Sequence, residues 1–517
     1  WDFIVNFDRM RIHFIIPFTA LVITSCAPSL QIVDRYSTQE KKTVELVKGK
    51  GEAGKVVKRI EYYPRGKKKS EVAISLGKKD GKYFGYHESG TLAVRGKYSG
   101  NLQSGKWTWT GMAGEIDSIH NYINGQFHGK TIYYKEGEIR ILKEYEAGKL
   151  SGKFVEYYSN ENKKVVGNYL GNLPHDQWLW RNDDKSKARL IHFRSGIKHG
   201  KFKVWNGGIL NLSGEFNNDQ KTGTWRWSQS KKQLDSLATY VNGVLNGEYK
   251  VWHRNGERAV VGVYSQGKYN GEWKWWSEDE NLDSLKTFKD GRLHGLSEFY
   301  YRNGQLKLST NYESHKLDGE VLSYFAFGEI KSKTTYLSGE KNGPYEIWSN
   351  NARLEEKGSF ANDQLHGQIQ RWYSNGVLAS IADYDEGIFE GLTQIFTLSN
   401  SLKRELFYEK GIEIARIEYH DNGRLKRVLI FNDGETLYER KWNLLGVEET
   451  EEKYILGTKL DSEFYLSGFL KYECIYKNGQ KHGMEWWFNA QHNPTKVNLY
   501  YLGKSIVGHE LVYETSE

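Results

Sequence analysis

A unit of 23 or 24 residues recurs almost without interruption along most of this chain. This period constrains the fold more than any other feature of the sequence. The stretch from Gly247 to Gly271 is one copy. A fixed period of this length is typical of arrays in which each unit contacts only its neighbours. We therefore predict one elongated repeat domain, although a chain of 517 residues would ordinarily divide into about three or four globular domains.

The units are aligned on the residue that precedes the first strand of each copy. This anchor is usually glycine and recurs regularly as far as Gly391, after which the series is looser. The nineteen anchors define eighteen intervals: Gly81, Gly105, Gly129, Gly152, Asp176, Gly200, Gly223, Gly247, Gly271, Gly295, Gly319, Gly343, Gly367, Gly391, Ala415, Tyr438, Asp461, Gly483 and Gly508.

Each unit reads as two strands joined by turns. The second and fourth positions after the anchor are usually apolar and the third is polar, as in Tyr249-Lys250-Val251, which is typical of a strand with one buried face. A turn such as Asn255-Gly256 follows, and Asn-Gly tolerates the positive φ that tight hairpin turns require. In the second strand an aliphatic residue precedes an aromatic by six positions, as in Leu306 and Tyr312. An even separation places both side chains on one sheet face.

These connections are too short for anything except an antiparallel meander. We therefore predict an all-β fold: an elongated single-layer antiparallel meander of about 18 β-hairpin repeats. Because strands twist in one sense, the sheet is expected to form a coiled ribbon or solenoid-like array. The 54 glycines, the 6 prolines and the 14% aromatic content agree with a protein of strands and turns.

A Trp-x-Trp pair marks some of the units. The units that begin at Gly105, Gly223 and Gly271 follow this pair with Ile-Asp-Ser-Ile or Leu-Asp-Ser-Leu, and the last two lie 48 residues apart, which indicates a two-hairpin unit in part of the array. Rows of aromatic residues on a single-layer sheet either pack among themselves or bind a partner. The candidate binding residues are Trp107, Trp109, Trp178, Trp180, Trp225, Trp227, Trp273 and Trp275.

The units resemble MORN repeats, in the bacterial variant with the pattern Tyr-Tyr-x-Asn-Gly-x-Leu followed by Tyr-x-x-Gly-x-x-x-Gly. The first part is present from Tyr300 to Leu306 and the second from Tyr240 to Gly247. The resemblance covers some four-fifths of the chain and weakens after about Gly391. It implies a long ribbon of hairpins, and it extends to proteins assigned to an antitoxin family.

The N-terminal region reads as an export signal. Residues 1–9 look like an upstream or non-native start, and translation is expected to begin at Met10. Residues 10–25 have the layout of a signal peptide, with a short apolar run that ends in small residues. The tetrad from Ile23 to Cys26 resembles the lipobox of bacterial lipoproteins, which implies acylation of Cys26. An ordinary signal peptide with a chance cysteine is the alternative.

The rest of the chain divides into four parts on this reading. Residues 26–53 are predicted to form a tether, 54–80 an irregular first repeat, 81–391 the regular array, and 392–517 degenerate repeats with a C-terminal cap. Basic residues outnumber acidic ones between Lys41 and Lys69. This segment either contacts anionic head groups or is a solvated linker.

No catalytic constellation is found, and no cofactor or metal is predicted. The sequence lacks zinc-type Cys/His spacing, a P-loop, a nucleophile elbow and a Rossmann fingerprint. Five histidines directly precede anchor glycines and are interpreted as turn residues: His128, His199, His294, His366 and His482. Cys474 lies in a strand pattern and is expected to be a packed thiol.

The favoured hypothesis is a non-enzymatic, lipid-anchored protein of the bacterial cell envelope. It would act as a scaffold for protein partners, within an outer-membrane assembly. The alternatives are an antitoxin or periplasmic immunity protein, and a glycan-binding surface protein. The membrane contact would run through the lipid on Cys26. The net charge of +8 is small for this length, and export argues against nucleic acid as a partner.

Overall fold

The structure is a computed structural model that describes residues 27–49, 54–231, 233–432, 434–449, 458–491, 494–501 and 503–510. The predicted signal segment 10–25 and Cys26 lie outside these residues. The described chain is built of strands, and it contains no helix long and apolar enough to cross a lipid bilayer. Strands β1 to β37 form one 37-stranded antiparallel sheet, and β38 to β42 form a separate five-stranded sheet. The predicted all-β antiparallel meander is confirmed.

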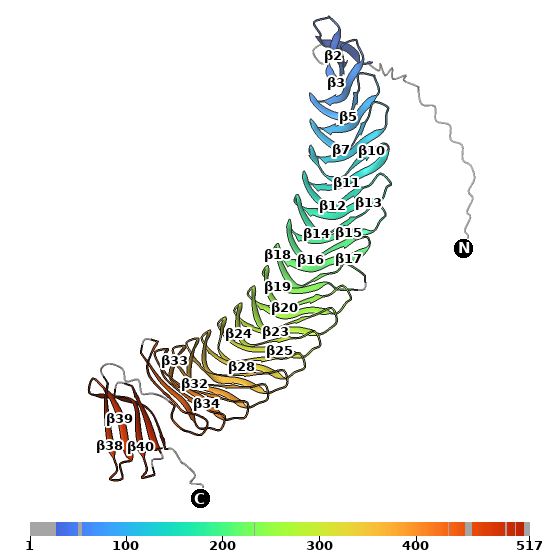
Figure 1. The fold of residues 1–517 in the computed structure, drawn as a ribbon. Coiled ribbons are helices and arrows are strands. Elements are labelled where there is room, and N and C mark those ends of the chain that lie inside the picture. The colour runs from blue at the N-terminus through green and yellow to red at the C-terminus, as the bar shows by residue number, and fades with distance from the viewer. Residues whose placement is uncertain are drawn as a thin grey trace, which may run out of the picture. The chain divides into compact units, whose positions relative to one another are not determined.

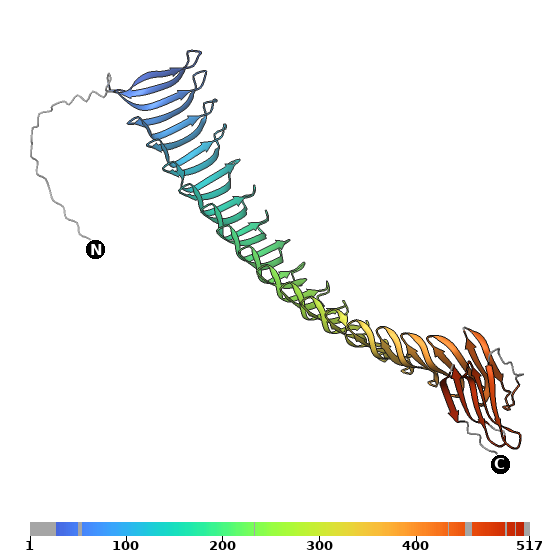
Figure 2. The same ribbon diagram turned by 90° about the vertical axis from the view of Figure 1, so that its left-hand side faces the viewer.

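The chain divides into two compact units, one ending at Thr222 and one beginning at Gly223. Each unit is a stack of hairpins (Figures 1 and 2). The strands of the first unit are β1 (Ser29–Arg35), β2 (Lys41–Lys48), β3 (Lys55–Tyr62), β4 (Lys68–Ser75), β5 (Lys78–Tyr86), β6 (Leu92–Ser99), β7 (Leu102–Thr110), β8 (Ile116–Ile123), β9 (Gln126–Phe127), β10 (Gly129–Lys135), β11 (Glu138–Glu146), β12 (Lys149–Tyr157), β13 (Lys163–Leu170), β14 (Leu173–Arg181), β15 (Lys187–Arg194), β16 (Ile197–Asn206) and β17 (Ile209–Asn217).

The division falls within β18 (Gln220–Trp227). The strands of the second unit that follow in the long sheet are β19 (Ser236–Val241), β20 (Val244–Trp252), β21 (Arg258–Ser265), β22 (Lys268–Trp276), β23 (Leu282–Lys289), β24 (Arg292–Tyr300), β25 (Leu306–Glu313), β26 (Lys316–Leu317), β27 (Gly319–Tyr324), β28 (Ile330–Leu337), β29 (Glu340–Trp348), β30 (Leu354–Ala361), β31 (Gln364–Trp372), β32 (Leu378–Asp385), β33 (Ile388–Phe396), β34 (Leu402–Glu409), β35 (Ile412–Tyr419), β36 (Leu425–Asn432) and β37 (Glu435–Lys441). The five-stranded sheet comprises β38 (Thr458–Phe464), β39 (Leu470–Lys477), β40 (Gln480–Phe488), β41 (Pro494–Tyr501) and β42 (Lys504–Glu510).

The N-terminal segments are more regular than the sequence suggested. Residues 26–53, predicted to be a tether, contain β1 and β2, and residues 54–80, predicted to be an irregular first repeat, contain the hairpin of β3 and β4. β2 buries Val44 and Val47, while the lysines at its two ends are exposed. The basic segment from Lys41 to Lys69 is therefore largely part of the sheet and not a solvated linker.

Two kinds of turn alternate along the sheet. In the turn that leads from one repeat into the next, both central residues have positive φ, as at Asn242 (49°) and Gly243 (80°). This is the type I′ pattern of tight hairpins. The turn between the two strands of one repeat is wider. At Asn255-Gly256 only the glycine takes a positive φ, of 98°. Asn255, unlike Asn242, does not have positive φ, and its side chain accepts a hydrogen bond from the Glu257 amide.

The anchor glycines lie inside strands. Gly247 belongs to β20, with a φ of 117°, where the register against β19 slips between Ala238 and Tyr240. The positive φ at this β-bulge explains why glycine recurs there, since glycine adopts positive φ without a steric penalty. The histidines that precede these glycines also lie in strands in four of the five cases, His199, His294, His366 and His482, so their interpretation as turn residues is corrected to bulge residues.

Side chains in the wide turns bind each repeat to the next repeat. Tyr301 Oη donates to the Tyr324 carbonyl at 2.8 Å, and Asn303 Nδ2 donates to the Ala326 carbonyl at 2.7 Å. The same tyrosine bond recurs from Tyr63 to Tyr86, from Tyr158 to Arg181 and from Tyr373 to Phe396. Each of these bonds joins residues 23 positions apart. The recurring turn residues therefore form contacts between repeats in addition to shaping the turn.

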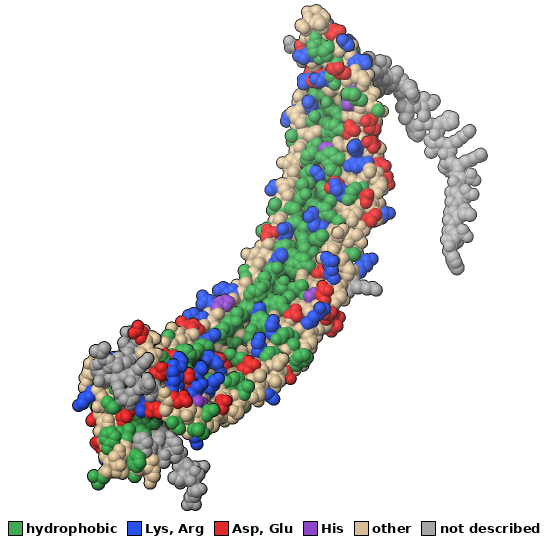
Figure 3. All heavy atoms as spheres, in the orientation of Figure 1, with side chains coloured by type: hydrophobic (Ala, Val, Ile, Leu, Met, Phe, Trp, Pro, Cys, Tyr) green, Lys and Arg blue, Asp and Glu red, His purple; other side chains and the backbone are tan. Residues whose placement is uncertain are grey.

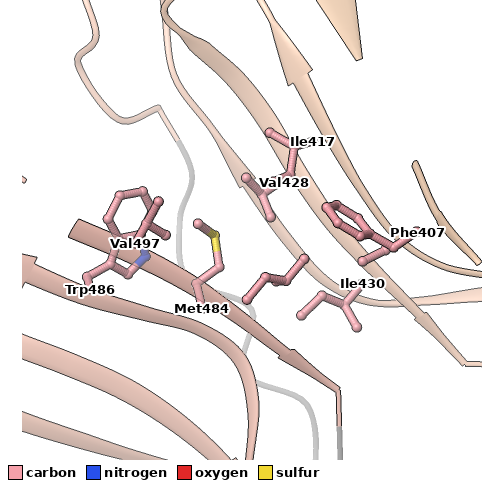
Figure 4. Close-up of a cluster of buried hydrophobic side chains, with 9 residues drawn as sticks. Phe407, Ile417, Val428, Ile430, Met484, Trp486 and Val497 are labelled. Carbon is pink, nitrogen blue, oxygen red and sulfur yellow. The ribbon is translucent and has the colours of Figure 1, made fainter. Parts of the chain in front are cut away.

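The C-terminal end of the second unit has two layers, which differs from the single layer predicted throughout. Met484 and Trp486 of β40 pack against the long sheet at Phe407, Val428 and Ile430 (Figure 4). The Arg440 guanidinium of β37 also binds the Glu473 carboxylate of β39 at 2.9 Å. Here Ala415 and Ile417 of β35 and Val428 and Ile430 of β36 are buried in the same cluster, so the sheet presents an apolar face that the five-stranded sheet covers. The segment 392–517 thus holds the last strands of the long sheet and this covering sheet.

Candidate interaction face

In each of the two compact units the candidate tryptophans lie on one side of the sheet, which we call the aromatic face. It carries the second and fourth positions after each anchor, because side chains two residues apart on a strand point the same way. Within each Trp-x-Trp pair the rings are neighbours, with centroids 5.8 Å apart for Trp107 and Trp109 and 5.9 Å apart for Trp273 and Trp275. In each unit hydrophobic side chains gather in a band flanked by charged residues (Figure 3).

The first tryptophan of each pair is buried. Trp107, Trp178, Trp225 and Trp273 are 2%, 5%, 1% and 1% exposed. These rings form the core of the repeats. The second tryptophan of each pair is partly exposed: Trp109, Trp180, Trp227 and Trp275. Only this second set can contact a partner from solution.

A glycine on the neighbouring strand makes room for three of the four buried rings, those of Trp107, Trp178 and Trp273. A β-carbon on Gly96 would approach the Trp107 ring to 2.1 Å, and Gly262 stands in the same relation to Trp273. The Trp107 indole N–H donates to the Lys97 carbonyl at 3.1 Å. The ring thus lies across strand β6 and reaches Tyr83 on β5, with centroids 5.4 Å apart. Phe154, Gly167 and Trp178 repeat this arrangement in the first unit, and Tyr249, Gly262 and Trp273 repeat it in the second.

This ring-over-glycine packing lets a single layer bury large side chains without a second sheet. The signal was present in the sequence, as an aromatic residue followed after 13 positions by glycine and after 11 more by tryptophan. This spacing was not recognised in the sequence because it spans three strands, and only strand pairing brings its members together.

Cations lie over two of the partly exposed tryptophans. The Arg189 guanidinium is 4.3 Å from the centre of the Trp180 ring, and the Lys286 ammonium is 5.2 Å from that of Trp275. Such pairs are attractive because the ring face carries partial negative charge. They also leave the N–H groups of the cations available to a carboxylate. The exposed part of the aromatic face therefore offers apolar area together with positive charge.

His120 sits among rings on the same face. Its imidazole centre is 4.4 Å from that of Trp109 and 5.3 Å from that of Tyr133, and neither ring nitrogen has a hydrogen-bond partner. Burial lowers the pKa of His120 to about 4, so the side chain is neutral at neutral pH. It acts as a packing residue on this face.

A second aromatic row occupies the opposite side of the sheet and was not recognised in the sequence. Its members stand at the fifth position after the anchor, as Trp276 does beside Trp275. Cations cover some of these rings too, with Arg258 5.6 Å from the centre of Trp276. The row includes Trp205, Trp252, Trp276, Tyr300, Tyr324, Trp348, Trp372 and Phe396. Counting the aromatic residues at the fifth position after each anchor would have revealed this second row.

The other residues that the sequence singled out have local roles. Cys474 is 1% exposed on β39, and burial raises the pKa of its thiol. His366 Nδ1 lies 3.1 Å from the Asp385 carboxylate, and His294 Nδ1 lies 3.3 Å from that of Glu313, as isolated pairs. Within the described ranges, no group of three or more His, Cys, Asp or Glu side chains could hold a metal ion.

Comparison with known proteins identifies the repeat. Four segments match the family model described as a MORN repeat variant. They are residues 269–290, 293–314, 317–337 and 365–386, all in the second unit. Each contains the return turn, the bulge glycine or the wide turn described above. A search of curated proteins finds no match to this chain.

Solved structures of toxin complexes align with this chain only at low scores. The crystal structure of TcdB2-TccC3-Cdc42 is 10% identical over 89% of this chain, with a TM-score of 0.14. The holotoxin pore structure from Photorhabdus luminescens with the TccC3 mutation D651A is also 10% identical, with a TM-score of 0.13. The chain spans about a third of the length of these chains, 31% and 30%. Scores at this level carry no argument about this protein.

Proposed function

We propose that this protein is a non-enzymatic repeat scaffold that binds a protein partner along its aromatic face. The observation that carries the proposal is the different burial of the two rings in each Trp-x-Trp pair. One ring is buried in the repeat, and the other is partly exposed beside cations such as Arg189 and Lys286. Apolar area with positive charge suits a partner that presents apolar and acidic side chains together.

A glycan partner receives less support from the same geometry. Sugars stack on open ring faces, and in Trp180 and Trp275 a cation lies over one face of the ring. The buried tryptophans offer no ring face to solvent. These contacts favour a protein partner over a carbohydrate.

We further propose that the scaffold is held at the bacterial cell envelope, at the outer membrane, by a lipid on Cys26. This rests on the lipobox-like sequence that precedes Ala27. The test is Cys26→Ser, which should move the protein from the membrane fraction to the soluble periplasmic fraction. Retention in the membrane without acylation would refute the anchor and leave the scaffold proposal intact.

The scaffold proposal is tested by crosslinking in intact cells, followed by identification of the proteins that copurify. Trp275→Ser should lose the crosslinked partner because it removes a partly exposed ring of the aromatic face. Trp276→Ser is the matched control, since it removes a neighbouring ring on the same strand from the opposite side of the sheet. Equal loss in both variants, or in neither, would contradict binding through the aromatic face. Rescue of growth against a coexpressed toxin would point instead to an immunity role.

A further inference from the structure

The first strand of the long sheet has a free edge. β1 pairs with β2 through Ser29 to Arg35, and among the described strands it has no other neighbour. All seven of its residues are exposed. A strand of this kind presents unpaired backbone N–H and C=O groups that can pair with another chain.

This edge is apolar where sheet edges are usually protected. Leu30, Ile32 and Val33 are 67%, 47% and 58% exposed. Lysine, proline or an inward charge would blunt such an edge. The register shifts after Ile32, so the regular stretch runs from Ser29 to Ile32. Asp34, beyond this stretch, is held in an ion pair with Lys42 at 2.8 Å.

The positive charge of the chain is concentrated beside this edge. Residues 27–99 contain 17 Lys and Arg and 8 Asp and Glu, a net charge of +9. Residues 100–517 contain 54 and 55, a net charge of −1. Part of this excess lies on the two strands that follow β1, at Lys41 and Lys48 of β2 and at Lys55 of β3. Any partner that reaches β1 must therefore approach through a positive field.

We propose that β1 receives an extended acidic segment of another protein, which adds to the sheet as a further strand. The free edge supplies the main-chain hydrogen bonds, the exposed aliphatic side chains supply apolar contact, and the surrounding lysines supply charge complementarity. A second copy of this chain is disfavoured because the two basic ends would repel each other. A lipid surface has no regularly spaced donors and acceptors that could pair with the edge as a strand does. The site is separate from the aromatic face and goes beyond the proposed function.

The test uses the full chain and a fluorescent octapeptide of alternating Glu and Val, with binding followed by fluorescence anisotropy. Two control peptides carry Lys in place of Glu, or Pro in place of two of the Val residues. The acidic peptide should bind, with an affinity that falls as salt is raised, and both controls should bind at least tenfold more weakly. The double variant Leu30→Asp, Ile32→Asp should weaken the acidic peptide at least tenfold.

The matched control is Ile123→Asp, Leu170→Asp, which changes two side chains of the same unit that are each 52% exposed. It should bind like the parent, and circular dichroism should show that both double variants are folded. Equal binding of the Pro peptide would overturn the proposal, because charge alone would then explain the affinity. A dimer of the parent that the edge variant loses, measured by sedimentation velocity, would overturn it in favour of a second copy. Binding to phosphatidylglycerol vesicles without binding to the peptide would overturn it in favour of a membrane.

Discussion

The indole ring of Trp107 lies across the α-carbon of Gly96, where a β-carbon would come within 2.1 Å of the ring. This contact, repeated at Gly167 and Gly262, is how a single sheet buries its largest side chains. It makes the glycine as much a part of the core as the tryptophan. Its consequences can be measured in the full chain.

Gly96→Ala should destabilise the first unit, because the new methyl group overlaps a rigid ring. We expect a loss of about 2 kcal/mol in local unfolding free energy, the usual cost of overpacking. Gly358→Ala is the comparison, since its methyl would meet the terminal methyl of Ile369 at 2.2 Å but a ring atom, of Tyr345, only at 3.0 Å, and it should cost less. Hydrogen exchange in β5 to β8 and in β29 to β32 measures the two effects. Equal losses would contradict the role of ring rigidity.

Asn303→Ala should loosen the junction between two repeats. The substitution removes the bond to the Ala326 carbonyl and the bond accepted from the Gln305 amide, with an expected cost of about 1–2 kcal/mol. Arg302→Ala, in the same turn, removes only an exposed ion pair to Asp279 and should cost clearly less, because solvent screens exposed ion pairs. Hydrogen exchange across residues 293–337 separates the two. A larger effect of Arg302→Ala would contradict the role of the Asn303 side chain in joining the two repeats.

Stability of the first unit should fall as the pH is lowered from about 6.5 towards 4, in part through His120. Burial lowers the pKa of the folded-state imidazole to about 4, while the unfolded side chain titrates near its ordinary value. Between these values the unfolded chain binds a proton that the folded chain does not, so acid favours unfolding. His120→Phe should reduce the loss between pH 7 and pH 5 by on the order of 1 kcal/mol. Parallel pH profiles for parent and variant in urea unfolding would refute this.

Met484→Ala should release the five-stranded sheet from the end of the long sheet. Met484 is 1% exposed and packs in the cluster with Phe407, Ile430 and Trp486, so its truncation leaves a cavity that costs about 2–4 kcal/mol. Exchange in β38 to β41 should accelerate while that in β28 to β32 stays as it was. Leu466→Ala, in a turn of the same sheet and fully exposed, is the control and should change neither. Uniform acceleration along the chain would show that the covering sheet is not a local element.

The sequence alone determined the repeat period, the strand alternation and the antiparallel meander. These follow from local chemistry, because glycine spacing sets where the chain turns and period-two alternation sets which residues share a face. It also identified the Trp-x-Trp pairs, and it placed Cys26 where an acyl anchor would attach, which stays a prediction. It did not distinguish Trp107 from Trp109, since both are apolar positions of the same strand.

Only the tertiary structure decided which ring is core and which is surface. That choice depends on Gly96, which stands eleven residues before Trp107 and meets it only through strand pairing. The same holds for the covering sheet at Met484, because contacts between residues about 50 to 80 positions apart leave no periodic trace. The free edge at β1 is likewise a property of where the sheet begins. Local patterns encode the hairpin, and long-range pairing decides what each face can meet.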